Sequence, residues 1–273
     1  MKDINYLKEN GVDINKCLEL FGDIETYNET IKEFKNSIDG KLDQIEKYYK
    51  DADMPNYAIY VHSLKSDCKY FGFIKLASIA YDHELKSKAN DLNYVKENYE
   101  TLITEARKVK AIVDEYLFDG EATNNLYSSN DIKPVKPEDP EQLCEDIILI
   151  ADDSEVIRIF VKKIFDADYE LAFAIDGQEA LNIIREHEED GRIKAVLLDL
   201  NMPKVDGFAV LDYMTQANLL DKMPVTIISG DSSKEAISKA FEYNIVDMLN
   251  KPFNEAKIKQ TVEKTIANIK SQY

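Results

Sequence analysis

The sequence predicts an all-α helical bundle followed by an α/β domain with a doubly wound parallel sheet. In residues 1–119, apolar residues recur at helical spacing in long segments joined by short connections. From residue 145 onward, short apolar runs alternate five times with helical stretches, as in successive βαβ units. The residues between hold three of the chain's seven prolines. We therefore expect a bundle over 1–119, a linker over 120–144 and a parallel sheet over 145–273.

Short connections between the predicted helices favour a four-helix bundle with one additional short helix. The expected helices cover about 13–21, 24–50, 54–71, 74–88 and 92–118. Gly40 falls inside the second of these and weakens it locally. Asn90 or Asp91 could cap the amino end of the last helix, since both side chains accept hydrogen bonds from free backbone N–H groups.

Composition excludes several classes of protein. The 273 residues carry a net charge of −18, and acidic residues outnumber basic ones in both halves. Nucleic-acid binding depends on Lys and Arg that neutralise phosphates, so we expect no nucleic-acid partner. No apolar run approaches the roughly 18–20 residues that span a bilayer, and the amino terminus lacks a signal pattern. We therefore expect a cytoplasmic protein without membrane insertion.

The three cysteines are far apart and show no metal-binding spacing. Cys17, Cys68 and Cys144 are therefore expected to be buried, reduced thiols, because free cysteine is among the most buried residue types.

Polar residues stand at the ends of four apolar runs: Asp152 with Asp153, then Asp199, Ser229 and Lys251. The carboxyl ends of parallel strands meet at one edge of a sheet, where ligands bind in open α/β folds. Three acids gathered there repel one another unless a cation joins them, and hard oxygen ligands suit Mg²⁺. Loop acids without a joint role are the alternative, but four sites in the correct order favour a pocket that captures a phosphoryl group on a carboxylate.

Residues 145–273 resemble a response-regulator receiver domain. The matching motifs are Asp152-Asp153, the Asp-x-x-Met-Pro-x-x-Asp-Gly segment from Asp199 to Gly207, Ser229-Gly230 and Lys251-Pro252-Phe253. The resemblance implies a flavodoxin-like sheet of order 2-1-3-4-5.

It also implies a role for each site residue. Asp199 would be the phosphoacceptor, and Ser229 and Lys251 would stabilise the phosphoryl oxygens. The implied ligands of Mg²⁺ are Asp152, Asp153, Asp199 and the backbone carbonyl of Asn201.

One position departs from the receiver pattern. Receivers usually carry Tyr or Phe as a rotameric switch three residues before the conserved lysine, and Met248 takes that position here. We still expect phosphorylation, but the way in which the signal reaches the surface is left open.

The helix predicted over residues 54–71 carries His62. Helical spacing places His62, Lys65, Ser66 and Lys69 on one face, which we expect to be exposed to water. Ammonium groups at i+3 and i+7 would favour the neutral imidazole and then pair with a bound phosphate. A lone histidine on a helix more often has no such role, and an imidazole turned inward and sealed from solvent would argue against it.

The surroundings of this histidine resemble a histidine-containing phosphotransfer (HPt) domain over roughly residues 8–118. His62, Leu64, Lys65 and Gly72 match the family motif in register. The resemblance implies that His62 accepts and donates phosphate, that Lys65 stabilises it and that Gly72 ends the helix. Three residues depart from the family's small residues: Ser66, Asp67 and Cys68. The carboxylate of Asp67 could slow transfer or select partners.

We therefore expect a phosphorelay protein that moves phosphate between His62 and receiver aspartates, either Asp199 or sites on partners. Sensor histidine kinases, other receiver domains and small phosphodonors are the expected partners. The sequence has no glycine-rich nucleotide loop, so we expect no ATP-dependent kinase activity of its own. The alternative is a scaffold or phosphate sink whose bundle only docks or dimerises. A transcription factor would need a basic helix-turn-helix segment and is not expected. The direction of transfer, and whether both sites meet within one chain, are left open.

Overall fold

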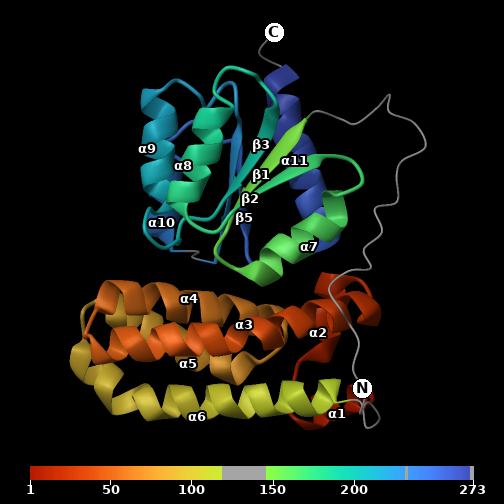
Figure 1. Cartoon of the computed structure of the whole chain (residues 1–273), viewed down its shortest axis with the longest axis vertical. Coiled ribbons are helices and arrows are strands. Elements are labelled where there is room, and N and C mark those ends of the chain that lie inside the picture. Colours follow the sequence, from red (N-terminus) through yellow and green to blue (C-terminus); the bar gives the residue numbers. More distant parts are fainter. Residues whose placement is uncertain (119–145, 231–232, 271–273) are drawn as a thin grey trace, which may run out of the picture.

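The computed structural model describes residues 1–118, 146–230 and 233–270 (Figure 1). The predicted linker over 120–144, including Cys144, lies outside the described residues. The predicted fold class is confirmed: a helical part is followed by a five-stranded parallel sheet covered by helices.

Six helices form the amino-terminal part, which we call the bundle: α1 (Ile4–Glu9), α2 (Ile14–Phe21), α3 (Ile24–Lys50), α4 (Met54–Tyr70), α5 (Ile74–Lys88) and α6 (Leu92–Leu117). The sequence did not predict α1, whose six residues contain one fully buried side chain, Leu7. α3 continues through Gly40 as one helix of 27 residues. Its apolar face packs along the bundle, and this packing outweighs the low helix propensity of one glycine.

Side chains in the sequence determine where these helices begin and end. Asp23, Asp53 and Asp91 each accept a backbone N–H at the amino end of α3, α4 and α6, respectively. Asp91 is therefore the cap of the last bundle helix. Gly72 follows α4 with a φ of +74°, a conformation that favours glycine. A β-carbon there would lie 2.8 Å from the Sγ of Cys17.

The carboxyl-terminal part, which we call the sheet part, alternates strands with helices. Its elements are β1 (Ile147–Ala151), α7 (Glu155–Phe165), β2 (Glu170–Ala174), α8 (Gly177–Glu186), β3 (Ile193–Leu198), α9 (Gly207–Gln216), β4 (Val225–Ser229), α10 (Lys234–Ala240), β5 (Asp247–Asn250) and α11 (Glu255–Lys270). The strand order is β2-β1-β3-β4-β5, as predicted, and every pair is parallel. α7 and α11 cover one face of the sheet, and α8, α9 and α10 cover the other (Figure 1).

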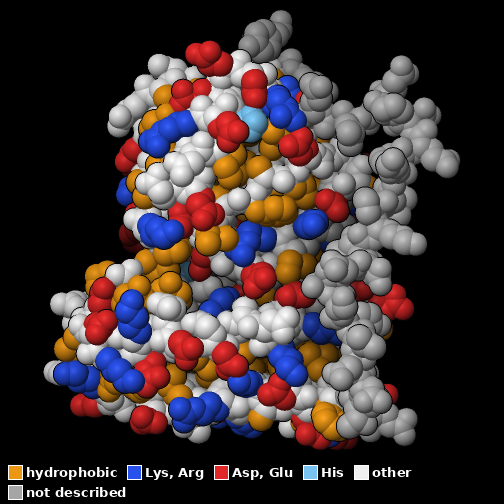
Figure 2. All heavy atoms as spheres, viewed as in Figure 1, with side chains coloured by type: hydrophobic (Ala, Val, Ile, Leu, Met, Phe, Trp, Pro, Cys, Tyr) orange, Lys and Arg blue, Asp and Glu red, His pale blue; other side chains and the backbone are white. Residues whose placement is uncertain are grey.

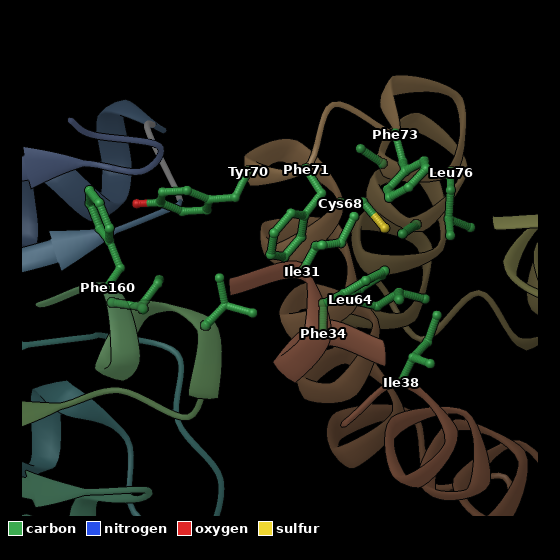
Figure 3. Close-up of a cluster of buried hydrophobic side chains, with 14 of the residues drawn as sticks. Ile31, Phe34, Ile38, Leu64, Cys68, Tyr70, Phe71, Phe73, Leu76 and Phe160 are labelled. Carbon is green, nitrogen blue, oxygen red and sulfur yellow. The ribbon is translucent and has the colours of Figure 1, made fainter. Parts of the chain in front are cut away.

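The buried apolar residues form two clusters. One lies between the sheet and α8, α9 and α10. The other contains the core of the bundle and continues into the sheet face covered by α7 and α11. Figure 3 shows the connection: Tyr70 extends from the end of α4 toward Phe160 of α7, while Phe71 points back into the bundle. The bundle and the sheet part therefore share one hydrophobic core across their contact.

Two further expectations concern the described residues. Cys17 and Cys68 are buried free thiols, as predicted. Within the described ranges, no helix is long and apolar enough to cross a membrane.

Acidic and basic side chains are interspersed over the visible face of both parts (Figure 2).

Candidate functional site

Three carboxylates meet where β1 and β3 end. These strands are neighbours, and Ala151 pairs with Leu198, so the residues that follow each strand leave the sheet side by side. One ligand oxygen from each of Asp152, Asp153 and Asp199 lies within 4.8 Å of the others. Asp152 and Asp199 are fully buried, whereas Asp153 is half-buried.

Lys251 follows β5 and supplies the buried cation of this cluster. Its Nζ lies 2.6 Å from Oδ2 of Asp152 and 2.5 Å from Oδ2 of Asp199. Burial opposes the charged ammonium, but Asp152 and Asp199 outweigh this effect and raise the pKa of Lys251. One ammonium facing three carboxylates leaves the site with excess negative charge.

Burial, together with this excess of negative charge, raises the pKa of two carboxyl groups. Burial, opposed by Lys251 and reinforced by Asp199, raises the pKa of Asp152 to about 7. Burial and Asp199 also raise the pKa of Asp153, against the opposing charges of Lys41 and Lys251. A divalent cation would relieve this repulsion, and carboxylate oxygens are the hard ligands that suit Mg²⁺. The residues present therefore fit a magnesium ion held by Asp152, Asp153 and Asp199.

The remaining predicted residues, Asn201, Ser229 and Met248, lie after β3, at the end of β4 and within β5. The backbone N–H of Asn201 donates a hydrogen bond to Oδ1 of Asp199 at 3.1 Å. Ser229 is buried at the end of β4, and its carbonyl accepts from the backbone N–H of Lys251 at 2.8 Å. Met248 lies in β5, partly buried, and packs on the sheet face opposite α7.

His62 does not face water, and this prediction is wrong. It is 1% exposed, and Lys65 and Ser66 are buried with it. The reason is the sheet part, which covers this face of α4. A β-carbon on Gly230 would lie 3.5 Å from both Cε1 and Nε2 of His62. His62 also lines a cavity together with Asn201, two residues after Asp199. The imidazole is thus covered by residues that follow the strands of the sheet part as well as by neighbouring side chains of the bundle.

Glu84 of α5, which the sequence analysis did not identify, holds the imidazole. Its Oε1 lies 2.7 Å from Nδ1 of His62. Its carboxylate also accepts from Lys65 at 2.6 Å and from Lys88 at 2.8 Å. Burial raises the pKa of Glu84, but His62, Lys65 and Lys88 outweigh it and hold the pKa well below its usual range. The sequence did contain a signal for this residue: helical spacing places Glu84 on the same face of α5 as the apolar residues Ala77 and Ala80, which are buried. A charged residue on such a face indicates a buried polar contact.

This contact determines which ring nitrogen carries the proton. An ionised carboxylate only accepts hydrogen bonds, so Nδ1 must carry the proton at 2.7 Å from Glu84. The Nζ of Lys65 is farther from Nδ1, at 3.3 Å. The lone pair of the neutral ring is therefore on Nε2. Nε2 is buried and has no hydrogen-bond partner among the described residues.

Asp67 contributes to the contact between the two parts. It is fully buried, pairs with Lys41 of α3, and accepts a hydrogen bond from Oγ of Ser154 at 2.7 Å. Ser154 immediately follows the acidic pair and caps α7. Asp67, which departs from the HPt pattern, thus forms a contact between the bundle and the sheet part. Its partner there, Ser154, is the residue next to Asp153.

Comparison with known proteins identifies the sheet part. Residues 148–263 match the family model described as "Response regulator receiver domain". A probable methanogenesis regulatory protein, FilR2, of Methanothrix harundinacea is 31% identical over 122 residues, which cover 43% of this chain and 79% of that protein. The transcriptional regulatory protein PrrA of Mycobacterium tuberculosis is 33% identical over 39% of this chain and 43% of its own length.

Other relatives share a smaller fraction of their length. A protein-glutamate methylesterase/protein-glutamine glutaminase of Pseudomonas aeruginosa is 36% identical over 110 residues, which cover 38% of this chain and 30% of that protein. Among solved structures, the receiver domain of the Francisella response regulator 1452 has 28% identity and a TM-score of 0.40, covering 45% of this chain and 97% of that chain. The chain thus covers less than half the length of the methylesterase and of PrrA.

Proposed function

Because the chain belongs to the response-regulator receiver family through residues 148–263, we propose that it is a two-component phosphotransfer protein in which His62 and Asp199 each carry a phosphoryl group. The bundle acts as an HPt domain over residues 1–119, and the receiver extends over 145–273. A sensor histidine kinase, another receiver domain or a small phosphodonor supplies the phosphate in the cytoplasm. The chain has no ATP-dependent kinase activity of its own, since its sequence has no glycine-rich nucleotide loop.

At the receiver, a carboxylate oxygen of Asp199 attacks the phosphorus of the donor, and the donor's leaving atom keeps the bonding electrons. The Nζ of Lys251 lies 2.5 Å from this carboxylate. Its ammonium group can therefore stabilise the negative charge of the phosphoryl oxygens once they are bonded to Asp199. Ser229 is placed to donate a hydrogen bond to one of those oxygens. Mg²⁺, when bound by Asp152, Asp153, Asp199 and the carbonyl of Asn201, supplies charge neutralisation for the transferred group.

At the bundle, the nucleophile is Nε2 of His62. Glu84 keeps the proton on Nδ1 and offsets the positive charge that the ring gains when Nε2 bonds to phosphorus. Lys65 lies beside the same carboxylate and can pair with the phosphoryl oxygens. Buried, water-poor surroundings strengthen each of these electrostatic contacts.

The observation that carries the proposal is the position of His62. Its Nδ1 is bonded, while Nε2 has no partner among the described residues and lies against Gly230 of the receiver pocket. The buried His83 of the bundle also has an Nε2 without a partner among the described residues, so what distinguishes His62 is its place beside the receiver pocket.

The test is labelling of the full-length protein with acetyl phosphate and Mg²⁺. We expect a base-labile phosphate on Asp199 and an acid-labile, base-stable phosphate on His62, both assigned by mass spectrometry of peptides. Asp199→Asn should remove the first and greatly reduce the second, while His62→Gln should remove only the second. Absence of label at both residues in the wild-type protein would refute the proposal.

The burial of His62 also favours a second candidate, a scaffold or phosphate sink in which the bundle only docks onto the receiver. Met248 at the switch position is compatible with it. In that case His62→Gln would leave transfer to a downstream receiver unchanged, and no phosphohistidine would form.

A further inference from the structure

We infer that the receiver that exchanges phosphate with His62 is the chain's own, and that Asp67, Ser154 and the aromatic residues around Tyr70 select it over receivers of other proteins. This inference rests on the proposed function, because it names the partner of the same site. Three independent sets of contacts support it.

The first set surrounds the imidazole. His62 lies against Gly230, which follows β4, and shares a cavity with Asn201, which follows β3. Lys88 of α5 also reaches toward Asn201, with Nζ and Oδ1 3.5 Å apart. The face of α4 that carries His62 is thus directed at the residues that follow β3 and β4, and Nε2 of His62 has no hydrogen-bond partner within the described ranges.

The second set is polar and buried. A carboxylate removed from water is costly unless it is paired and hydrogen-bonded. Asp67 meets this condition through Lys41 of the bundle together with the hydroxyl of Ser154 on the receiver. A receiver without a hydrogen-bond donor at the position of Ser154 would leave part of this buried carboxylate unsatisfied. Asp67 can therefore discriminate between receivers at a position beside the acidic pocket.

The third set is aromatic. Tyr70 at the end of α4 packs edge-on against Phe253, with ring centroids 5.9 Å apart, and its hydroxyl accepts the backbone N–H of Phe253 at 3.2 Å. Phe160 of α7, which Figure 3 labels, is 2% exposed. It contacts Phe21 of α2, with ring centroids 5.5 Å apart. If the two parts separated, these rings would form an exposed apolar patch of a kind that soluble proteins usually cover.

Transfer between the two residues balances without a further reactant, with Mg²⁺ supplying charge neutralisation when it is bound at the acidic cluster. From phospho-Asp199, the lone pair of His62 Nε2 attacks phosphorus, a P–N bond forms, and the bond from phosphorus to the Asp199 oxygen breaks. The carboxylate of Asp199 keeps that electron pair. The proton stays on Nδ1 of His62, where it is hydrogen-bonded to Glu84. The reverse step returns the phosphoryl group to Asp199 and the lone pair to Nε2. Neither direction releases or takes up a proton.

The decisive experiment compares transfer within a chain with transfer between chains. Wild-type protein is labelled with acetyl phosphate and Mg²⁺ at concentrations from about 0.1 to 10 μM, and the rate of phosphohistidine formation per chain is measured. In parallel, His62→Gln is mixed with Asp199→Asn at about 1 μM of each. A tethered pair has an effective concentration of the order of millimolar, so we expect the mixture to be at least about a hundredfold slower than the wild type.

A docking variant with a matched control tests the selecting contacts. Phe160→Glu places a charge in the aromatic cluster and should slow phosphohistidine formation at least tenfold, while Asp199 is still labelled. Phe241→Glu makes the same change on the same domain at a residue that is 57% exposed, and should have no effect. If Phe160→Glu prevents labelling of Asp199, the experiment uses the variant Tyr70→Phe instead, with Tyr116→Phe as its control. Each of these two variants loses one hydrogen bond of a phenol hydroxyl.

The outcomes separate this inference from the proposed function. Phosphohistidine in the mixture at a rate near that of the wild type, or a wild-type rate per chain that rises in proportion to concentration, overturns exchange within one chain and leaves the proposed function intact. Equal rates for Phe160→Glu and Phe241→Glu overturn the role of the aromatic contact. No phosphohistidine in any sample overturns the proposed function, and with it this inference.

Discussion

Glu84 is the residue on which the proposed phosphotransfer at His62 depends. Its carboxylate fixes the proton on Nδ1 and holds two lysines beside the ring. Glu84→Gln keeps a hydrogen-bond acceptor but removes the charge. We expect it to slow phosphate transfer to His62 roughly tenfold, since partners that orient a ligating histidine contribute roughly 10- to 100-fold at metal sites.

The control for this variant is Glu105→Gln, which removes another largely buried carboxylate of the bundle, one that pairs with Lys75 at 2.5 Å. It should leave phosphohistidine formation unchanged. Labelling of Asp199 should be the same in both variants. Equal loss of transfer in both would mean that Glu84 acts only through the stability of the bundle.

The same carboxylate should affect stability in a pH-dependent way. Its pKa in the folded protein lies below the ordinary 4.5. The unfolded chain therefore takes up the proton first as the pH falls, and the stabilising contribution of Glu84 is present above about pH 4.5 and is lost below it. Urea unfolding at pH 7 should show Glu84→Gln to be less stable than wild type by roughly 1–3 kcal/mol. This difference should shrink as the pH falls below 4.5, and a constant difference would contradict the pKa shift.

Metal binding can be tested at Asp153, the half-buried member of the acidic cluster. Mg²⁺ should raise the thermal unfolding temperature of the wild type, with a free-energy gain of about 2.7 kcal/mol at a concentration 100 times its dissociation constant. Asp153→Asn should reduce this gain strongly, whereas Asp168→Asn, an exposed acid on the same domain, should not. Chelation with EDTA should reverse the effect in the wild type.

At the scale of single residues, the sequence predicted the strand-end cluster because parallel topology alone brings those positions together. Asp152, Asp153, Asp199 and Lys251 lie where the alternation of strands and helices requires. The exposure of His62 could not be predicted in this way. Helical periodicity distinguishes the core face of a helix from its other face, but it does not reveal that a second part of the chain covers that other face.

At the scale of elements, the helix boundaries were predicted to within a few residues because caps and glycines are local signals. Asp91 and Gly72 act through their own backbone neighbours. α1 was missed because six residues carry too little periodicity. It is held instead by contacts distant in sequence, such as the backbone hydrogen bond from Lys2 to Tyr116 at 2.8 Å.

Two glycines of the bundle should respond in opposite ways to alanine. Gly40 is exposed in the middle of α3, and a β-carbon there has no atom within 4 Å, so Gly40→Ala should raise the free energy of unfolding by about 0.5–1 kcal/mol. Gly72 has positive φ and lies against Cys17, so Gly72→Ala should lower it by at least about 1–2 kcal/mol. Urea denaturation of both variants checks this, and a gain for Gly72→Ala would contradict the packing described for the end of α4.

At the scale of the whole molecule, the strand order followed from the sequence pattern, while the docking of the bundle onto the receiver did not. Its contacts join residues far apart in the chain, such as Asp67 with Ser154 and Tyr70 with Phe253. In the sequence, none of these side chains is marked as a contact between the bundle and the receiver. Only their juxtaposition shows that a buried carboxylate and a phenol hydroxyl acquire partners across the contact.

Docking in solution can be measured without any phosphate chemistry. Diethyl pyrocarbonate modifies accessible imidazoles, and the three histidines of the chain differ in exposure: His62 and His83 are buried, while the His187 side chain is 16% exposed. In the wild type we expect His187 to react at least tenfold faster than His62, as followed by mass spectrometry of peptides. Phe160→Glu should accelerate the reaction at His62 and leave His83, which is buried within the bundle, protected. Phe241→Glu should change none of the three rates. Reaction of wild-type His62 as fast as His187 would contradict the docked arrangement, because Gly230 of the receiver lies against that imidazole in the described structure.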